Sequence, residues 1–314
     1  MDKLYNTQYS TPFELYSYVS CPLTSRVTTV MVSSMKCQVI SSPHASSSET
    51  LSREQIVKST RAKSRKTRVY KFFKFLRKHY STILNDDNAF ILDVAGGKGD
   101  LSFMIANIYD SSPIVVDPRN TNHTSLLRSI SFLKQNPELV EERSVEGSLS
   151  FQPLAALLHE LEEKRKRREN DWISPINMQI YFNDDLIEAV YKEYEQKGSW
   201  EKFWLSKRWN DAISAEASWA YIMNTKLIVG FHPDQATESI VDFALFMNIP
   251  FAIVPCCVFP SEFPNRRWNG ERVRDHRVFI EYLKAKHPKI QVEKLDFDFC
   301  ESGKNTVLFT ELQE

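Results

Sequence analysis

Residues 90–102, FILDVAGGKGDLS, form an apolar run that ends near the acid Asp93 and is followed by Gly96, Gly97 and Gly99. The chain of 314 residues contains only eight glycines, so three within four positions mark a loop with special backbone requirements. The apolar run predicts a strand, and the residues after the glycines have the pattern of a helix. The unpaired N–H groups at the start of such a helix suit a nucleotide-like ligand.

Strands and helices alternate after this loop. Strands are expected at 90–95, 113–117, 178–182, 226–231, 250–257, 290–297 and 305–310, and the main helices between them at 99–109, 124–135, 235–248 and 274–287. This alternation predicts an α/β fold, a doubly wound Rossmann-like sheet of seven mostly parallel strands. The last two strands lie too close together for a crossover helix, so an antiparallel terminal hairpin is expected.

Composition divides the chain into segments. The N-terminal part is rich in serine and has no acid between Glu14 and Glu49, which favours disorder. The expected segments are this N-terminal part at 1–52, a basic helical segment at 53–89, and a main domain at 90–314 with helical insertions at about 136–176 and 183–225. Long insertions in an α/β domain often act as lids or bind substrate.

Charge is unevenly spread although the net charge is zero. Between Arg53 and Lys78 there are eleven lysines and arginines and a single acid, Glu54. Within this run, 68–80 has apolar residues at helical spacing, so a helix with one packed face and one basic face is expected. The basic segment 53–79 is a candidate RNA-binding surface, and the plain alternative is a solvated helix.

The cysteines and the hydropathy bound the location of the protein. Five scattered cysteines make no disulfide framework, which favours a reducing, intracellular compartment, cytoplasmic or nuclear. No apolar run approaches the length of a membrane span. The first 50 residues are acid-poor and serine-rich, as transit peptides are, but contain less arginine than those usually do, so organellar targeting is not favoured.

Two cofactor classes compete for the glycine loop. A dinucleotide would require a third glycine where Ser102 stands, and the carboxylate of Asp93 would crowd a pyrophosphate. S-adenosylmethionine has no phosphate, and its ammonium group would be attracted by Asp93. The pattern acid-x-Gly-x-Gly-x-Gly maps onto Asp93, Ala95, Gly97 and Gly99, with Ala95 in place of the first glycine.

Two further acids follow the next strands. Asp117 ends the second strand, where a carboxylate can accept both hydroxyls of a ribose. Asp184 follows the third strand, where a polar side chain can reach an adenine amino group. The alternative for each acid is a helix cap or a turn.

Three blocks carry a resemblance to a known family: DVAGGKGDLS (93–102), GFHPDQATE (230–238) and VPCCVFPSEFP (254–264). Over about 90–312 the chain resembles a class I S-adenosylmethionine-dependent methyltransferase of a group that includes tRNA ribose 2′-O-methyltransferases. The resemblance implies a seven-stranded sheet with strand seven antiparallel. The chain departs from the family at His232-Pro233-Asp234-Gln235-Ala236, where a cysteine and a glycine are replaced, and it lacks the cysteine–histidine zinc modules of the tRNA enzymes.

Candidates for chemistry follow the fourth and fifth strands. His232 can act as a general base, or can be a structural histidine, and Asp234 can orient it or cap the next helix. Cys256 of the adjacent pair Cys256-Cys257 is expected to line the pocket on the substrate side. No metal is expected, because neighbouring cysteines suit a tetrahedral site poorly. Arg266 and Arg267 are candidates to bind substrate phosphates at the pocket mouth, and the alternative for each is a solvated loop residue.

The sequence therefore predicts an S-adenosylmethionine-dependent methyltransferase that binds the cofactor through Asp93, Ala95, Gly96, Gly97, Gly99, Asp117 and Asp184. RNA is the expected substrate, and a protein or a small molecule is the alternative acceptor. A non-catalytic RNA-binding protein of the same fold is another alternative. A nicotinamide-dependent oxidoreductase is a third, against which Ser102 and Asp93 argue.

Overall fold

The structure, a computed structural model, describes residues 39–40, 60–137, 152–169, 171–207, 213–295 and 304–311. All of them belong to one unit, Cys37–Glu314. Apart from residues 39–40, the serine-rich segment predicted at 1–52 lies outside the described residues.

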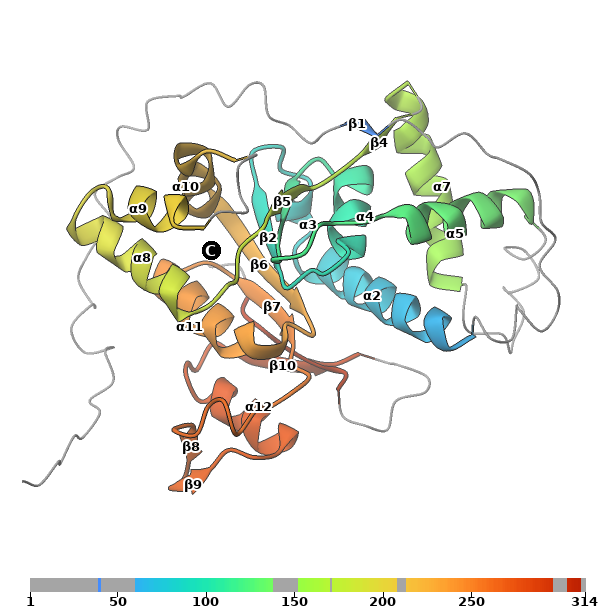
Figure 1. The fold of residues 1–314 in the computed structure, drawn as a ribbon. Helices are drawn as coiled ribbons and strands as arrows, with labels where there is room; N and C mark the ends of the chain where they lie inside the picture. The colour runs from blue at the N-terminus through green and yellow to red at the C-terminus, as the bar shows by residue number, and fades with distance from the viewer. Residues whose placement is uncertain are drawn as a thin grey trace, which may run out of the picture. The chain divides into compact units, whose positions relative to one another are not determined.

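One seven-stranded sheet organises the described residues (Figure 1). In spatial order the strands are β10 (Gln291–Lys294), β11 (Thr306–Phe309), β7 (Phe251–Val254), β6 (Thr225–Phe231), β2 (Phe90–Val94), β3 (Ser112–Val116) and β5 (Ile176–Met178). The strands from β7 to β5 run parallel to one another, and β11 runs antiparallel to both β7 and β10. The predicted Rossmann-like fold and its antiparallel terminal hairpin are therefore confirmed.

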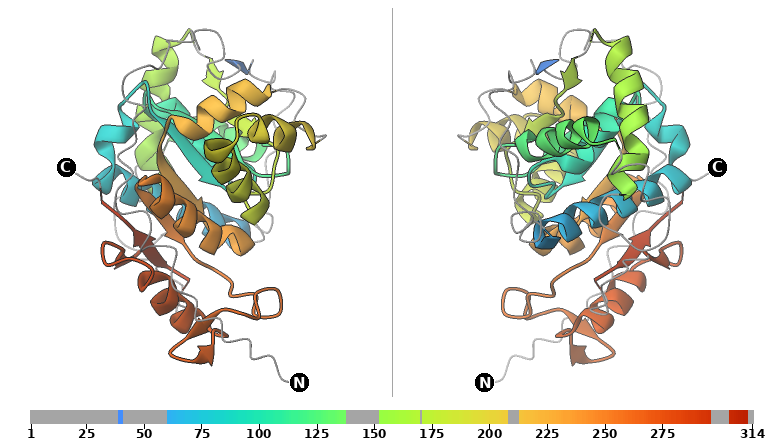
Figure 2. Two further views of the ribbon diagram at one scale, coloured as in Figure 1. Left: turned by 90° about the vertical axis from the view of Figure 1, so that its left-hand side faces the viewer. Right: turned by 90° about the vertical axis from the view of Figure 1, so that its right-hand side faces the viewer.

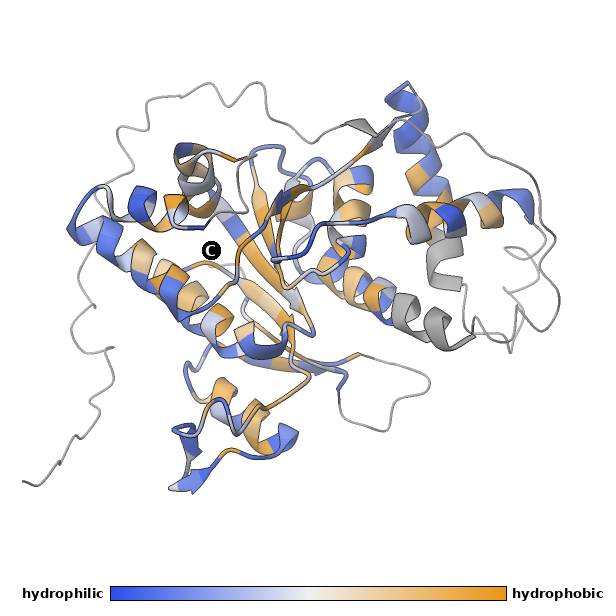
Figure 3. Cartoon of the chain, in the orientation of Figure 1, coloured by the Kyte–Doolittle hydropathy of each residue, from blue (hydrophilic) through white to orange (hydrophobic). Residues whose placement is uncertain are grey.

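The central strands carry apolar side chains on both faces of the sheet because helices cover both faces. Side chains alternate along a strand, and on β2 Ile91 enters one core cluster while Leu92 and Val94 enter the other. Burial on two faces makes the central strands nearly continuous apolar runs, which Figure 3 shows as the hydrophobic colour along them. The core thus consists of two apolar layers separated by the sheet.

Helices form the outer layers, as the views in Figures 1 and 2 show. One layer contains α2 (Thr60–His79), α3 (Ser81–Leu84), α4 (Asp100–Ile108), α5 (Thr124–Gln135) and α7 (Gln152–Arg167). The other contains α8 (Asp184–Glu195), α9 (Ser199–Leu205), α10 (Ala215–Met223), α11 (Thr237–Met247) and α12 (His276–Lys284). The predicted insertions therefore supply packed helices to both layers, and Trp200 and Trp204 of α9 are buried against each other.

Strands β7 and β5 end before the predicted positions. The strand expected at 250–257 is β7, which ends at Val254. The segment 178–182 was expected to be the third strand, but β5 ends at Met178. Among the described strands its one neighbour is β3, whose last residue, Val116, pairs with Met178, so β3 offers no partner beyond that point. Ile180 N–H then donates to the Met178 carbonyl in a turn, at 2.9 Å.

Two short ribbons lie outside the main sheet. The strands β1 (Val39–Ile40) and β4 (Trp172–Ile173) pair antiparallel. The strands β8 (Arg267–Trp268) and β9 (Glu271–Arg272) form a hairpin through Asn269 and Gly270, whose φ angles are 50° and 82°. Two left-handed residues in a two-residue loop are typical of a type I′ turn, for which Asn-Gly is a preferred sequence.

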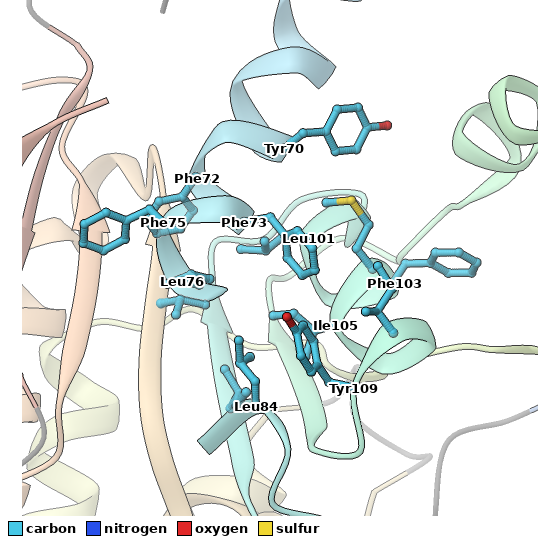
Figure 4. Close-up of a cluster of buried hydrophobic side chains, with 14 of the residues drawn as sticks. Tyr70, Phe72, Phe73, Phe75, Leu76, Leu84, Leu101, Phe103, Ile105 and Tyr109 are labelled. Atoms are coloured by element: carbon cyan, nitrogen blue, oxygen red, sulfur yellow. The ribbon is translucent and has the colours of Figure 1, made fainter. Parts of the chain in front are cut away.

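The basic helix α2 is part of the core. Its Phe72, Phe73 and Leu76 are fully buried, and Figure 4 shows this side of α2 packed near Leu101 and Ile105 of α4. The fully buried Tyr80 follows α2, and its hydroxyl donates to the Phe251 carbonyl at 3.0 Å and the Thr310 carbonyl at 2.7 Å. Tyr80 thus ties the helical layer to two neighbouring strands.

We expect Tyr80→Phe to lower the free energy of unfolding by about 1–2 kcal/mol, because it leaves the buried Thr310 carbonyl without this donor. The measurement is urea unfolding at neutral pH. Tyr194→Phe is the control, because Tyr194 is 45% exposed and its loss of a hydroxyl should change the stability by less than about 0.5 kcal/mol. Equal stabilities of the Tyr80 variant and the wild type would contradict this role.

Candidate active site at the carboxyl edge of the sheet

The strand order reverses direction at β2. The chain passes from β2 to β3 and β5 on one side, and it later adds β6 and β7 on the other. Helix α4, which follows β2, packs on one face of the sheet, whereas α11, which follows β6, packs on the opposite face. The segments that leave β2 and β6 therefore diverge, and open α/β sheets bind ligands in the crevice at such a point.

The loop after β2 turns through left-handed backbone conformations. Ala95 N–H donates to the Val116 carbonyl at 2.8 Å, and Ala95, Gly97 and Gly99 have φ angles of 54°, 60° and 77°. Ala95, which replaces the first glycine of the predicted pattern, thus adopts a conformation that costs a residue with a Cβ atom about 1 kcal/mol. A Cβ atom added at Gly99 would also lie 3.1 Å from the His123 ring. The loop is therefore both tightly turned and closely packed.

Asp93 is a buried carboxyl beneath this loop. It is 1% exposed, and its Oδ2 accepts from Ser102 Oγ at 2.8 Å, while a Cβ atom at Gly96 would lie 2.7 Å from the same oxygen. Its Oδ1 has no hydrogen-bond partner among the described residues. Burial raises the pKa of Asp93 to about 7, against the lowering effect of the Ser102 hydrogen bonds. Ser102, which stands where a dinucleotide fold has its third glycine, therefore holds Asp93.

Asp117 organises the loop from the end of β3. Its Oδ2 accepts from Gly97 N–H at 2.9 Å, and the guanidinium of Arg119 binds both carboxylate oxygens at 3.0 Å. Burial alone would raise the pKa of Asp117, but the hydrogen bonds from Arg119 and Gly97 hold it below its usual value. The expected ribose-binding position is thus covered by Arg119, whose side chain is 76% exposed on the side away from Asp117.

The end of β6 brings His232 and Asp234 to the same edge. Both have left-handed backbones, with φ of 58° and 48°, and His232 N–H donates to the Val254 carbonyl at 3.1 Å. Within the described chain, neither ring nitrogen of His232 has a hydrogen-bond partner. Burial, and then the positive charges of Arg68 and Lys304, lower the pKa of His232 to about 4. His232 is therefore neutral at pH 7 and can accept a proton or a hydrogen bond.

Asp234 contacts the segment after β7. The Cys256 thiol lies 3.0 Å from Asp234 Oδ1, with the geometry of a donated hydrogen bond. Burial and then the neighbouring Asp234 carboxylate raise the pKa of the Cys256 thiol. Asp234 was predicted to orient His232 or to cap a helix, and neither role includes the contact with Cys256. Asp234 does begin a 3-10 turn, Asp234–Ala236, whose Asp234 carbonyl accepts from Thr237 Oγ1 at 2.7 Å.

The three remaining predicted site residues have different environments in the structure. Arg266 is 6% exposed, forms an ion pair with Glu238 and stacks on Phe263, and this burial contradicts the prediction that it grips substrate. Arg267 is exposed on the β8–β9 hairpin, and its predicted role stays a prediction. Asp184 begins α8 and accepts from Ser239 Oγ of α11 at 3.0 Å, so its carboxylate already bridges two helices.

Three residues at this edge escaped the sequence analysis. Arg119 covers Asp117, and its pKa is raised first by its hydrogen bond to Asp117 and to a smaller extent by the nearby Asp234 and Tyr181. His123 is buried against Phe103, and burial lowers its pKa to about 4. Tyr181 is 60% exposed. None of the three had a clear sequence signal, because Tyr181 lay within the predicted third strand and comes after its end only because β5 stops at Met178.

The edge as a whole fits a nucleoside with a cationic group. The unpartnered Asp93 Oδ1 suits an ammonium group, because a buried polar atom is normally hydrogen-bonded. The loop 95–99 permits close approach of a ligand to the backbone. Both oxygens of Asp117 already accept hydrogen bonds from Gly97 N–H and from the backbone and side chain of Arg119, so ribose hydroxyls would have to displace the Arg119 guanidinium.

We expect Asp93→Asn to stabilise the fold at pH 8. The folded-state pKa of about 7 exceeds the ordinary value of 3.8, so between these pH values the folded state keeps a proton that the unfolded state has lost. The wild type therefore loses stability as the pH rises through this window. The variant should be about 1–3 kcal/mol more stable than the wild type at pH 8, with a smaller difference at pH 5, because asparagine carries no charge to bury.

Urea unfolding at the two pH values measures this effect. Asp110→Asn is the control, because Asp110 is exposed at the far end of α4. A variant that is less stable than the wild type at pH 8 would show that the ionised carboxylate supports the fold.

Comparison with known proteins finds no relative of this chain. The chain matches no model of a protein family, and no curated protein is significantly similar to it.

Proposed function

We propose that the chain is an S-adenosylmethionine-dependent methyltransferase that acts on RNA. The observation that carries the proposal is the buried Asp93, whose Oδ1 lacks a partner in the described part of the chain, beneath a loop of left-handed residues at the reversal of strand order. A carboxylate at this point attracts the ammonium group of the cofactor and would repel a pyrophosphate. This charge preference favours S-adenosylmethionine over a nicotinamide dinucleotide.

Each residue has a defined task in this proposal. Asp93 binds the ammonium, the loop 95–99 lies along the nucleoside, and Asp117 accepts the ribose hydroxyls after Arg119 moves away. When bound, the cofactor supplies a methyl group on a positively charged sulfur. His232, neutral because of its burial, accepts a hydrogen bond from the acceptor group and holds it in line. Positioning of this kind accounts for much of the rate of a group transfer between bound molecules.

The charges near His232 support RNA as the substrate. The positive charges of Arg68 on α2 and of Lys304 before β11 both act on the His232 ring. The basic helix therefore reaches the end of β6, where the acceptor would bind. On the same helix Lys74 is exposed, whereas Arg77 and Lys78 pair with Glu160 and Glu293. The surface that RNA would meet is thus the part of α2 nearest the site.

One observation favours a second function. The bidentate contact of Arg119 with Asp117 occupies the ribose position, as expected of a domain that keeps the fold and no longer binds the cofactor. Such a chain would bind RNA without methylating it. The two functions differ in cofactor affinity and in methyl incorporation.

We expect the purified chain to bind S-adenosylmethionine, and Asp93→Asn to weaken that binding by about 10- to 100-fold, because a buried charge-assisted contact contributes roughly 1.5–3 kcal/mol. Calorimetry at pH 8, where the variant is expected to be the more stable protein, separates lost binding from lost folding. Asp110→Asn should bind as the wild type does.

The variant Arg119→Gln, titrated with S-adenosylmethionine in the same way, tests the role of Arg119. If Arg119 competes with the ribose for Asp117, the variant should bind the cofactor more tightly than the wild type. Uptake of a nicotinamide dinucleotide, with none of S-adenosylmethionine at millimolar concentration, would overturn the proposal.

We expect methyl groups from labelled cofactor to enter RNA, and Lys74→Glu to weaken RNA binding. Because each phosphate contact releases about one counterion, the variant should lower the slope of log affinity against log salt by about one. Lys226→Glu is the matched control, since Lys226 is exposed at the start of β6, away from the carboxyl edge. RNA binding without methyl incorporation would instead support the non-catalytic function.

A further inference from the structure

A cluster of metal-binding side chains lies where two neighbouring strands end. Asp234 follows β6, and Cys256 and Cys257 follow β7, which runs parallel to β6. The His232 N–H to Val254 carbonyl hydrogen bond ties the two strand ends together. One ligand atom from each of the three residues lies within 4.8 Å of the other two, and Cys256 Sγ is 3.0 Å from Asp234 Oδ1.

The position of the two cysteines beyond the end of β7 explains how both thiols can lie near one carboxylate. Within a strand, neighbouring side chains point to opposite faces of the sheet. The strand ends at Val254, so Cys256 and Cys257 are free of this alternation, and both thiols lie near the same carboxylate. The adjacent pair argued against a metal while only the sequence was considered. The structure answers this objection in part, because both thiols and a third ligand from the end of a neighbouring strand lie within 4.8 Å of one another.

The donor set and its burial select the kind of ion. Two sulfur atoms favour thiophilic cations, and a carboxylate oxygen completes a mixed set that Zn²⁺ accepts. Cys256 is 7% exposed, whereas Asp234 is exposed, so the cluster has a buried wall and an open side through which an ion can enter. Three protein ligands and one open position are the arrangement of reactive rather than structural zinc sites.

We propose that Asp234, Cys256 and Cys257 bind a thiophilic divalent cation, with Zn²⁺ the expected ion. The proposal does not rest on methyl transfer, because it concerns the affinity of the chain for a metal alone. It places the ion beside His232, at the end of the crevice where the acceptor group of a substrate would lie.

The test is a Co²⁺ titration of the full-length chain, reduced and freed of metal. In a background with Cys21, Cys37 and Cys300 changed to serine, the only remaining thiols are Cys256 and Cys257. We expect one equivalent of Co²⁺ to bind with a sulfur-to-cobalt charge-transfer band in the near ultraviolet, and Zn²⁺ to displace it. Cys256→Ser and Cys257→Ser should each abolish or strongly reduce the band.

Asp234→Asn separates the three-ligand site from a simple thiol pair. It should lower the metal affinity at least about tenfold, while Asp110→Asn leaves it unchanged. The same single variants in the wild-type background, compared with the wild type by circular dichroism and titration, keep the test valid should the serine background fold poorly. Absence of the band in the folded chain, its persistence in Cys256→Ser, or an unchanged affinity in Asp234→Asn would overturn the proposal.

Discussion

The reversal of strand order at β2 is the constraint on which the rest of the structure depends. Because β3 and β6 flank β2 on opposite sides, α4 and α11 pack on opposite faces, and the segments after β2 and β6 move apart. This separation brings Asp93, Asp117 and His232 to one edge although they come from distant parts of the sequence. The same parallel arrangement requires strands buried on both faces, which is why the sheet is nearly continuous in apolar residues.

Asp93 shows a conflict between folding and ligand binding. A carboxyl group that is almost fully buried, with one oxygen unpartnered among the described residues, raises its own pKa and costs the fold stability at neutral pH. An uncharged side chain that still accepts from Ser102 would meet the structural need without that cost. A positively charged ligand group would turn this buried charge into a favourable interaction, and this is the physical basis of the proposed binding of S-adenosylmethionine.

The sequence was sufficient for the sheet and for the loop, because both depend on local patterns. Alternating apolar segments placed the strands, and the spacing of Gly96, Gly97 and Gly99 placed the turn. The end of β5 at Met178 could not be predicted, since it is set by where β3 stops. The burial of Arg266 depends on Glu238, 28 positions away, and the covering of Asp117 by Arg119 depends on a side-chain conformation. The β8–β9 hairpin, in contrast, could have been predicted, because Asn269-Gly270 is a preferred sequence for a type I′ turn.

The two halves of the carboxyl edge of the sheet differ in chemistry, and this difference bears on how the site works. The β2–β3 end holds carboxylates, tight backbone turns and the exposed Tyr181, which suit a nucleoside. The β6–β7 end holds His232, Asp234 and two thiols, with the positive charges of Arg68 and Lys304 close by. Because burial and the neighbouring carboxylate raise the pKa of the Cys256 thiol, that thiol is uncharged at neutral pH, and Asp234 is the acid that an anionic substrate would meet at that end. A divalent cation bound by two thiolates and a carboxylate leaves one net negative charge on the cluster, the same as the metal-free carboxylate beside two protonated thiols. The proposed metal therefore does not change the attraction of an anionic substrate to Arg68 and Lys304, and the proposed metal and the proposed RNA substrate are independent of each other.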